Sequence, residues 1–225
     1  YSELYRYNKD GKFRVVKALK PKYRGDFLYE SLLRKEYEIG YELDHINICK
    51  IFSWLYTEEL GNCIEMEYID GVTLQDEIEG GTLDKGDVRK IILEICDALT
   101  YIHHKQIIHR DLKPQNIIIT HNGKNVKLID FGLSDTDWHS ILKGKGGTIE
   151  YAAPELIEEG DIDCRTDIWS LGVIINHLGE RYRKIARKCM NKEKQKRFSS
   201  AEEIKKSILQ SDTRKYWWII PAGIA

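Results

Sequence analysis

The first third of the chain alternates apolar and polar residues in short runs. Residues 12–19 (Lys-Phe-Arg-Val-Val-Lys-Ala-Leu) predict a strand, and the turn formers at 8–11 would pair it with an earlier strand near 2–7. Two more short strands are predicted near 48–56 and 62–68. The pattern indicates a β-rich beginning that opens with a hairpin.

Two longer segments carry apolar residues at helical spacing. Residues 27–43 place them among many charges, which predicts an amphipathic helix. Residues 83–103 predict a second, stronger helix. Its apolar face consists of Val88, Ile91, Ile92, Ile95, Leu99 and Ile102. The change of period near 67–71 joins a β-rich part to a helical remainder.

Composition and charge narrow the class of protein. With 42% hydrophobic and 32% charged residues and only four prolines, the chain is neither disordered nor fibrous. Its 225 residues allow one large domain or two lobes that share a cleft. The formal net charge of −1 gives no overall attraction to nucleic acid, so no nucleic-acid partner is expected.

The five cysteines indicate a reducing compartment. They are Cys49, Cys63, Cys96, Cys164 and Cys189. Their number is odd and no C-x-x-C pair occurs, which argues against a disulfide framework or a zinc site. Residues 1–20 mix charges with apolar residues, unlike a signal peptide. A cytoplasmic location is expected.

Two features near the end of the chain leave alternatives open. Residues 181–197 carry nine cations against one anion, a local charge of +8. This segment is either a solvated helical face or a contact for an anionic membrane surface or an acidic partner. Residues 217–225 are wholly apolar after Arg214-Lys215. Nine residues are too few to cross a bilayer. The tail therefore either begins a spanning helix or packs back onto the helical part. A spanning helix would anchor the chain on the cytoplasmic face of a membrane.

The strongest chemical signal is the run His109-Arg110-Asp111-Leu112-Lys113-Pro114-Gln115-Asn116, followed by Asp130-Phe131-Gly132. Phosphoryl transfer explains why these residue types occur together. Asp111 could accept the proton of a hydroxyl nucleophile, and Lys113 could neutralise charge on the phosphoryl group. Asn116 and Asp130 are hard oxygen ligands suited to Mg²⁺.

With these motifs the chain resembles the eukaryotic-type protein kinase family, over about residues 2–209. The resemblance implies an α+β, two-lobed fold: a β-rich N-lobe at 1–66, a hinge at 67–71, a helical C-lobe at 72–210 and a tail at 211–225. Lys17 is then the lysine that contacts the phosphates and Glu36 its ion-pair partner. The implied cofactors are ATP and Mg²⁺, which Mn²⁺ could replace. The implied ATP-binding residues are Lys17, Val15, Met66, Glu67, Ile69 and Ile118, with Met66 as the gatekeeper.

The resemblance also bears on the substrate. The segments Ala152-Ala153-Pro154-Glu155 and Asp167-Ile168-Trp169 match the platform that accepts a peptide, with Glu155 paired to Arg197. Lys113 and Gly147-Thr148 resemble the serine/threonine branch. The expected partners are therefore protein substrates. A second copy of the chain is also an expected partner, because Ser140 or Thr136 in the loop at 130–155 is an expected site of autophosphorylation. The alternative is that the hydroxyls of this loop are never modified.

Three departures from the family pattern limit the resemblance. The Gly-rich loop over the phosphates is not among these residues, and Gly40 replaces a large apolar residue expected to pack against Phe131. Only Gly179-Glu180-Arg181 stands where the family has a further helix and loops. The compact pattern looks like membrane-tethered bacterial members. One alternative is a catalytically silent binding module. The other is a small-molecule kinase, and the segment Ala153-Pro154-Glu155 argues against this second alternative.

Overall fold

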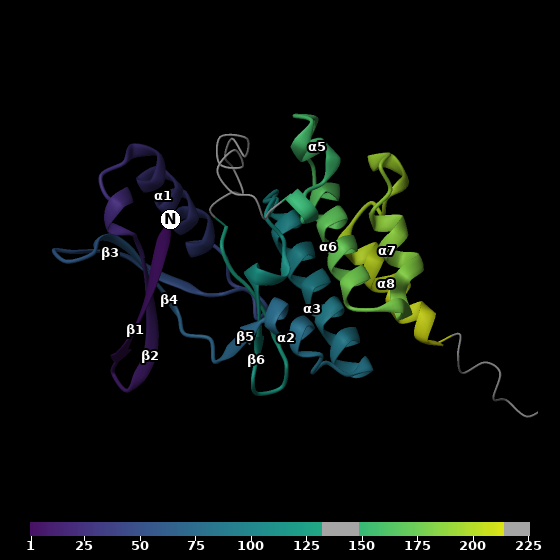
Figure 1. Ribbon diagram of the computed structural model, residues 1–225, viewed down its shortest axis with the longest axis horizontal. Helices are drawn as coiled ribbons and strands as arrows, with labels where there is room; N and C mark the ends of the chain where they lie inside the picture. The colour runs from purple at the N-terminus through teal and green to yellow at the C-terminus, as the bar shows by residue number, and fades with distance from the viewer. Residues whose placement is uncertain (132–148, 214–225) are drawn as a thin grey trace, which may run out of the picture.

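A four-stranded antiparallel sheet forms the N-terminal lobe of the computed structural model, which describes residues 1–131 and 149–213 (Figure 1). The strands lie in the order β1-β2-β4-β3. They are β1 (Ser2–Lys9), β2 (Lys12–Leu19), β3 (Ile51–Thr57) and β4 (Gly61–Glu67). The predicted opening hairpin and the two later strands are confirmed, with ends that differ by a few residues.

The turn between β1 and β2 shows why the hairpin forms. Only Asp10 and Gly11 lie outside the strands, and their φ angles are 53° and 78°. A two-residue turn with both φ angles positive matches the right-handed twist of the strands, and Asp-Gly is a favoured pair for it. The register Lys17 with Leu4 then places the Lys17 side chain toward one face of the sheet.

One helix, α1 (Phe27–Tyr41), packs beside this sheet after the 3-10 turn Pro21–Tyr23. The Asp26 side chain caps it by accepting a hydrogen bond from the Leu28 N–H at 2.9 Å. Its buried side comprises Leu32, Leu33, Glu36 and Gly40. The predicted helix at 27–43 is thus confirmed, and its inward face carries one carboxylate.

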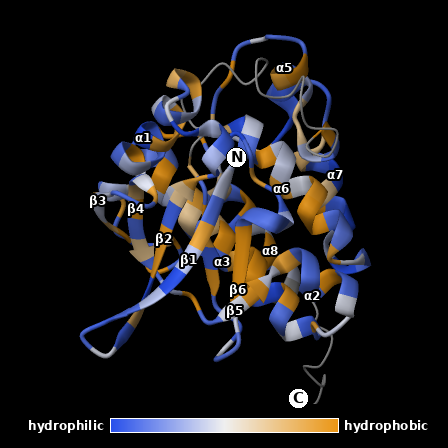
Figure 2. Cartoon of the chain, turned by 60° about the vertical axis from the view of Figure 1, so that its left-hand side comes forward, coloured by the Kyte–Doolittle hydropathy of each residue, from blue (hydrophilic) through white to orange (hydrophobic). Residues whose placement is uncertain are grey.

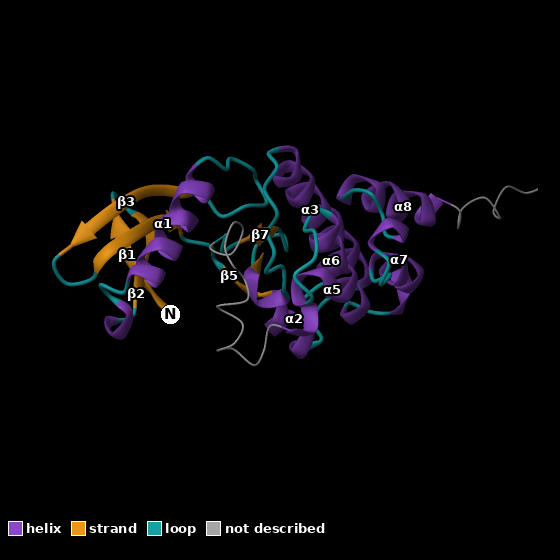
Figure 3. Cartoon of the chain, turned by 90° about the horizontal axis from the view of Figure 1, so that it is seen from above, coloured by secondary structure: helices purple, strands orange, loops and turns teal. Residues whose placement is uncertain are grey.

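The C-terminal lobe is mainly helical (Figure 3). Its helices are α2 (Leu74–Gly80), α3 (Lys85–His104), α5 (Pro154–Ile157), α6 (Arg165–His177), α7 (Arg183–Cys189) and α8 (Ala201–Thr213). A small antiparallel sheet faces the other lobe and contains β5 (Gly71–Thr73), β6 (Ile117–Thr120) and β7 (Val126–Leu128). Four 3-10 turns complete the described elements: Pro114–Asn116, Ile149–Tyr151, Glu180–Tyr182 and Lys194–Lys196.

The main core lies around α3 and α6 (Figure 2). The predicted apolar face of the helix at 83–103 is confirmed, because Ile91, Ile92, Ile95, Leu99 and Ile102 are all fully buried. Asp84 starts α3 by accepting hydrogen bonds from the Gly86 and Asp87 N–H groups at 2.6 and 2.7 Å. Helix α3 thereby forms the rigid base on which the chemical motifs rest.

Backbone and side-chain contacts join the two lobes. Leu128 of β7 donates its N–H to the Asn47 carbonyl at 2.8 Å and accepts from the Cys49 N–H at 2.8 Å. Lys127 forms an ion pair with Glu67 at 2.7 Å. These contacts fix the segment before β3 and the end of β4 against the C-terminal lobe, so the cleft between the lobes has a defined geometry.

Several other expectations can be compared with the fold. All five cysteines are free, and four of them are buried. Helix α6 leads to α7 through a single 3-10 turn, as the short segment 179–181 indicated. In the described ranges, no helix is both long and apolar enough to cross a membrane. The tail at 217–225 lies outside them.

Candidate active site

A hollow of about 470 Å³ opens between the two lobes. Its apolar walls include Val15, Met66, Ile69, Ile118 and Ile129. Charged groups, Lys17, Glu36 and Asp130, stand in the same hollow. An apolar slot beside a charged group fits a flat heterocycle attached to an anionic chain. Every residue predicted to bind ATP, including Glu67, lines this hollow.

Lys17 contacts the other two charged residues of the hollow, Glu36 and Asp130. Its Nζ contacts both carboxylate oxygens of Glu36 at 2.6 Å and Asp130 Oδ1 at 3.5 Å. Burial opposes the charge on the lysine, but the Asp130 and Glu36 carboxylates outweigh burial and raise the pKa of Lys17 above its usual value. The predicted Lys17–Glu36 pair is confirmed as a contact. The ammonium is thus fixed and positively charged.

The loop after α3 presents Asp111. One carboxylate oxygen, Oδ2, accepts hydrogen bonds from Lys113 Nζ at 2.7 Å and from Asn116 Nδ2 at 3.0 Å. Asn116 also donates to the Asp111 carbonyl at 2.9 Å. The other carboxylate oxygen, Oδ1, is buried and has no hydrogen-bond partner among the described residues. A buried carboxylate oxygen left without a donor is costly, so it indicates a place for a donor from outside.

Asp167 of α6 holds this loop from below. Its carboxylate accepts hydrogen bonds from the backbone N–H groups of His109 at 2.8 Å and Arg110 at 2.9 Å. His103 Nε2 lies 2.8 Å from the same carboxylate. Burial disfavours its charge, but the contacts with His103 and His109 keep the pKa of Asp167 below its usual value. Asp167 is therefore an anion that the loop's own N–H groups stabilise.

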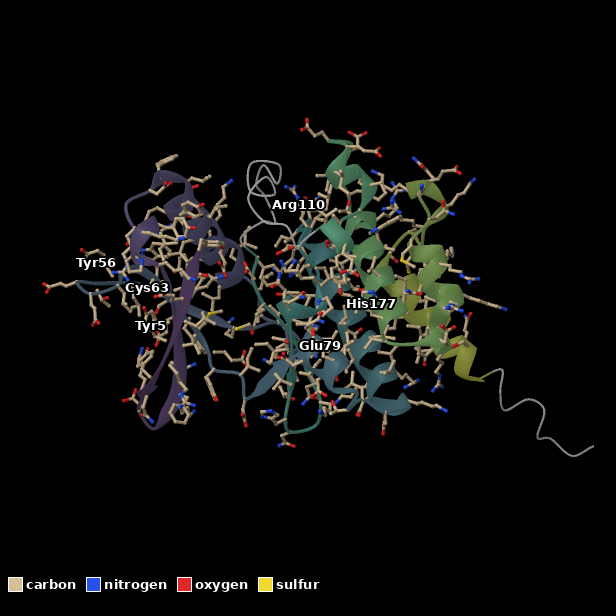
Figure 4. The ribbon with its side chains drawn as sticks, viewed as in Figure 1. Tyr5, Tyr56, Cys63, Glu79, Arg110 and His177 are labelled. Atoms are coloured by element: carbon tan, nitrogen blue, oxygen red, sulfur yellow. The ribbon has the colours of Figure 1, made fainter. Side chains whose placement is uncertain are left out.

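The backbone of the loop needs such support. Arg110 has a φ of 62° and Asp130 a φ of 67°, both in the left-handed region that residues with a Cβ rarely adopt. Figure 4 shows Arg110 in the C-terminal lobe, nearer the N-terminal lobe than His177 at the end of α6. The two unusual φ angles orient the residues on either side, including Asp111.

The two candidate metal ligands are connected through the backbone. The Ile129 N–H donates to the Asn116 carbonyl at 3.0 Å, which brings Asn116 beside the residue before Asp130. Among the described residues, no group of three or more His, Cys, Asp or Glu side chains could hold a metal. Mg²⁺ is commonly bound by one or two protein oxygens together with substrate phosphates, which is the arrangement that an Asn–Asp pair could serve.

The segment that begins at residue 149 is anchored to the C-terminal lobe. Glu155 forms a bidentate pair with Arg197, at 2.7 and 2.8 Å, and accepts from Thr166 Oγ1 at 3.0 Å. The predicted Glu155–Arg197 pair is confirmed. The Tyr151 hydroxyl also lies 3.0 Å from His177 Nδ1. Residues 149–155 are therefore held against α6, the helix that carries Asp167.

Gly40 proves to be part of a close contact. A Cβ on Gly40 would lie 2.4 Å from Ile51 Cδ1, so the space beside this glycine is already filled by a β3 side chain. Phe131, which the absent side chain was expected to contact, is 2% exposed and packs against the His109 ring with centroids 5.0 Å apart. Gly40 therefore leaves no void, while looser coupling of α1 to Phe131 stays a prediction.

Some predictions fall on residues that the structure does not describe. Ser140, Thr136 and the pair Gly147-Thr148 lie between 132 and 148, outside the described residues. All other predicted site residues lie in or beside the hollow. The residues that line it are Val15, Lys17, Glu36, Met66, Glu67, Ile69, Ile118 and Asp130. The residues that belong to the adjacent Asp111 loop are Asp111, Lys113 and Asn116.

Other residues of the site were not identified from the sequence. Ser2, Leu4 and Arg6 of β1 line the hollow, and so does Cys49. Burial raises the pKa of the Cys49 thiol to about 12, so it is a small apolar wall rather than a nucleophile. Strand alternation predicts that residues 2, 4 and 6 share one face, but only the pairing with β2 shows which face meets the cleft.

Comparison with known proteins gives a consistent result. The family model described as the protein kinase domain matches residues 1–217. Aurora kinase C of Mus musculus is 36% identical over 167 residues, which cover 72% of this chain and 60% of that protein. The serine/threonine-protein kinase PrkC of Bacillus subtilis is 34% identical over 172 residues, which cover 73% of this chain and 26% of that protein. The chain thus spans less than two thirds of the length of these relatives.

A solved structure has the same fold. The kinase domain of PknI from Mycobacterium tuberculosis superposes with a TM-score of 0.73 and covers 93% of this chain and 91% of that one. Its sequence is 22% identical. This likeness supports the two-lobed arrangement described above.

Proposed function

The chain belongs to the protein kinase family, and from this membership and the geometry of the cleft we propose that it is an active serine/threonine protein kinase. It would transfer the γ-phosphoryl group of ATP to hydroxyl groups of proteins, including those of a second copy of itself. Because ATP is an intracellular substrate, the reaction would take place in the cytoplasm. The proposal goes beyond family membership, since a family member could also bind nucleotide without catalysis.

The state of the Asp111 carboxylate carries the proposal. Two donors, Lys113 and Asn116, hold Oδ2, while Oδ1 is buried without a partner among the described residues. A structural carboxylate would use both oxygens, because a buried acceptor without a donor destabilises the fold. A substrate hydroxyl could supply that missing donor. Asp111 would then orient the hydroxyl and accept its proton.

The hollow supports ATP as the second substrate. Val15 and Met66 from the N-terminal lobe and Ile118 and Ile129 from the C-terminal lobe would enclose the adenine. Residues 67–69 border the same space. Lys17, fixed by Glu36, would contact the phosphates. Asp130 and Asn116 would hold Mg²⁺, which neutralises charge on the phosphate oxygens when bound.

The proposed transfer forms one bond and breaks another. The acceptor hydroxyl oxygen bonds to the γ-phosphorus, and the bond between that phosphorus and the bridging oxygen of ADP breaks. The hydroxyl proton passes to the Asp111 carboxylate, and ADP leaves with the electron pair of the broken bond. Lys113, 2.7 Å from Asp111, is placed to reduce the charge that accumulates on the phosphoryl oxygens.

Three observations favour a serine or threonine of a protein as the acceptor. Lys113 lies beside Asp111, as in the serine/threonine branch that the sequence resembles. The relatives named above include a serine/threonine kinase. The anchored segment at 149–155 offers a surface for a peptide near the cleft.

The test is transfer of labelled phosphate from ATP with Mg²⁺, using the purified full chain and a generic protein substrate, followed by phosphoamino-acid analysis. We expect phosphoserine and phosphothreonine. Asp111→Asn should reduce the rate by about 10²–10⁴-fold, and Asp130→Asn should abolish transfer. Asp70→Asn is the matched control, because this aspartate is exposed, its carboxylate lies 3.1 Å from His121 Nδ1, and it does not line the hollow.

Three results would overturn the proposal. Binding of ATP without any transfer by the unaltered chain would identify a silent binding module. Transfer that Asp111→Asn leaves unchanged would show that Oδ1 does not receive the hydroxyl. Phosphotyrosine as the only product would contradict the serine/threonine assignment.

A further inference from the structure

The most basic surface of the described chain lies far from the cleft, on and beside α7. Residues 181–197 carry +8, which leaves −9 on the rest of the chain. Helix α7 buries Ala186 and Cys189 and exposes four cations, Arg183, Lys184, Arg187 and Lys188. Four carboxylates from outside the segment form ion pairs with it, so the segment with these partners carries +4 and the rest of the chain −5. The molecule is therefore polarised although its net charge is only −1.

Many cations of this segment are engaged in ion pairs within the protein. The pairs are Arg183–Glu180 at 2.6 Å, Lys188–Glu203 at 3.2 Å, Lys194–Asp163 at 3.2 Å, Lys196–Glu193 at 2.6 Å and Arg197–Glu155 at 2.7 Å. Lys184 and Arg187 differ from these residues. They are exposed, and neither takes part in the ion pairs just described.

The two cations border a hollow of about 430 Å³. It is lined by Glu180, Arg181, Tyr182, Arg183, Lys184, Ile185, Arg187 and Ser211. Because Lys184 and Arg187 are three residues apart on a helix, they lie on one face. Lysine and arginine side chains around a hollow can surround an anionic headgroup, and the Ser211 hydroxyl adds a neutral donor.

The position of Ser211 connects this surface to the end of α8. Helices α7 and α8 lie side by side at the end of the molecule away from the N-terminal lobe (Figure 1). The sequence continues past Thr213 with Arg214 and Lys215 and then the nine apolar residues 217–225. Two more cations and two tryptophans thus follow directly in the chain from the rim of the basic hollow. Cations next to tryptophans are typical of segments at a membrane interface.

We propose that the surface formed by Arg181, Arg183, Lys184 and Arg187, named here the α7 basic surface, binds the anionic headgroups of a lipid bilayer. The charge of the surface supplies attraction and orientation, since an anionic bilayer attracts this net positive end of the molecule and repels the negatively charged remainder. The apolar sequence that follows Thr213 in the chain favours a bilayer over an acidic protein segment. This inference does not depend on the proposed kinase activity.

The test is sedimentation of the full chain with vesicles of phosphatidylcholine alone or with about one third phosphatidylglycerol. The unaltered chain should prefer the anionic vesicles, and about 0.5 M NaCl should abolish that preference, because salt screens exposed charges. Lys184→Gln with Arg187→Gln should weaken binding to anionic vesicles by about 30-fold, since each cation near the bilayer contributes about fivefold.

Controls separate this surface from the overall charge and from the tail. Lys12→Gln with Lys22→Gln changes the charge equally on the N-terminal lobe, where both lysines are exposed, and should leave binding unchanged. Trp217→Ser with Trp218→Ser should weaken binding to both kinds of vesicle but keep the preference for the anionic ones. The melting temperature of each variant checks that it is folded.

Three outcomes would overturn the proposal. These are equal binding to neutral and anionic vesicles, unchanged binding by the Lys184–Arg187 variant, and tight binding to polyglutamate without binding to vesicles. The last result would assign the α7 basic surface to an acidic protein partner.

Discussion

Two neighbouring cations, Lys196 and Arg197, form ion pairs of nearly equal length in very different surroundings. Lys196 and its partner Glu193 are 60% and 64% exposed in their side chains, whereas Arg197 and Glu155 are 0% and 11% exposed. Water solvates the first pair whether or not it forms, so it contributes little to stability. In the second pair, each charge depends on the other.

Replacing Arg197 by alanine should therefore destabilise the fold. The Glu155 carboxylate would lose its bidentate partner, at a cost of about 3–5 kcal/mol. Denaturant unfolding measures this cost, and Lys196→Ala should change the free energy of unfolding by less than about 0.5 kcal/mol. Equal effects of the two substitutions would contradict the difference in burial.

A second buried carboxylate makes stability depend on pH. Glu65 of β4 is 3% exposed and accepts hydrogen bonds from Tyr7, from Lys9 at 2.9 Å and from Ser53 at 2.7 Å. Burial opposes its charge, but these donors outweigh burial and lower the pKa of Glu65 to about 2. In the unfolded chain the value is 4.5.

Because the pKa of Glu65 is lower in the folded state, its contribution to stability is complete above pH 4.5. It should be lost as the pH falls from 4.5 toward 2. Glu65→Gln should lower the free energy of unfolding by about 1.5–3 kcal/mol at pH 7 and by clearly less at pH 3. Glu58→Gln, in the exposed turn between β3 and β4, is the control. A difference that does not change with pH would contradict this account.

Residues adjacent in sequence could be interpreted directly, whereas the distant pairs Lys17–Glu36 and Glu155–Arg197 were predicted only through the resemblance to a family. Asp111, Lys113 and Asn116 form one motif, so the order of the residues was enough to interpret their chemistry. Asp167 was recognised as part of the family pattern, but its bonds to the His109 and Arg110 N–H groups span 58 and 57 residues. No periodicity encodes such a contact, because it depends on how α6 packs beneath the loop.

At the scale of elements, α1 and β3 fit together through Gly40. Helix α1 carries Glu36, so its position determines whether Lys17 has a partner. The Ile51 side chain fills the space beside Gly40 and thereby lets the helix approach the strand closely. The sequence showed the missing side chain but not the neighbour that replaces it.

Gly40→Ala should push α1 away from β3. Overpacking of this kind costs about 1–3 kcal/mol and would lengthen the Lys17–Glu36 contact, so the proposed phosphoryl transfer should slow. Ile51→Val in the same chain removes the Cδ1 atom that the new methyl group would meet and should restore both stability and rate. A double variant as impaired as Gly40→Ala alone would show that this contact is not the cause.

The period of apolar residues predicted the longer elements well. Residues 83–103 give α3 almost unchanged, because its buried residues recur at helical spacing over about three turns, from Ile91 to Ile102. The short helices α2 and α7 have seven residues each, and their patterns are too brief to be distinguished from loops. The capping box of Thr73 and Asp76 marks the start of α2 more clearly than its apolar residues do.

For the whole molecule, the cleft predicts a coupling between nucleotide and stability. The hollow takes residues from both lobes, so ATP would add contacts across them that the unfolded chain cannot make. A ligand at 100 times its dissociation constant adds about 2.7 kcal/mol of stability. For a chain of this length, the melting temperature should rise by about 5–10 °C with Mg-ATP.

Lys17→Met distinguishes binding from positioning. The apolar walls around the adenine remain in this variant, so most of the rise in melting temperature should persist while phosphoryl transfer is largely lost. Ile118→Trp should instead abolish the rise, because an indole would fill the apolar slot. Equal loss of thermal shift and transfer in Lys17→Met would contradict the separate roles.

The hydrogen bonds between Asp167 and the Asp111 loop affect when the site can form during translation. During synthesis Lys17, Asp111, Asn116 and Asp130 are all translated before residue 131. Asp167, which holds the loop that carries Asp111, is translated 36 residues after residue 131. The nascent chain thus carries every reactive group without the helix that arranges them. The proposed phosphoryl transfer would therefore begin only after α6 has been translated and has docked, so unfinished chains would not phosphorylate their surroundings.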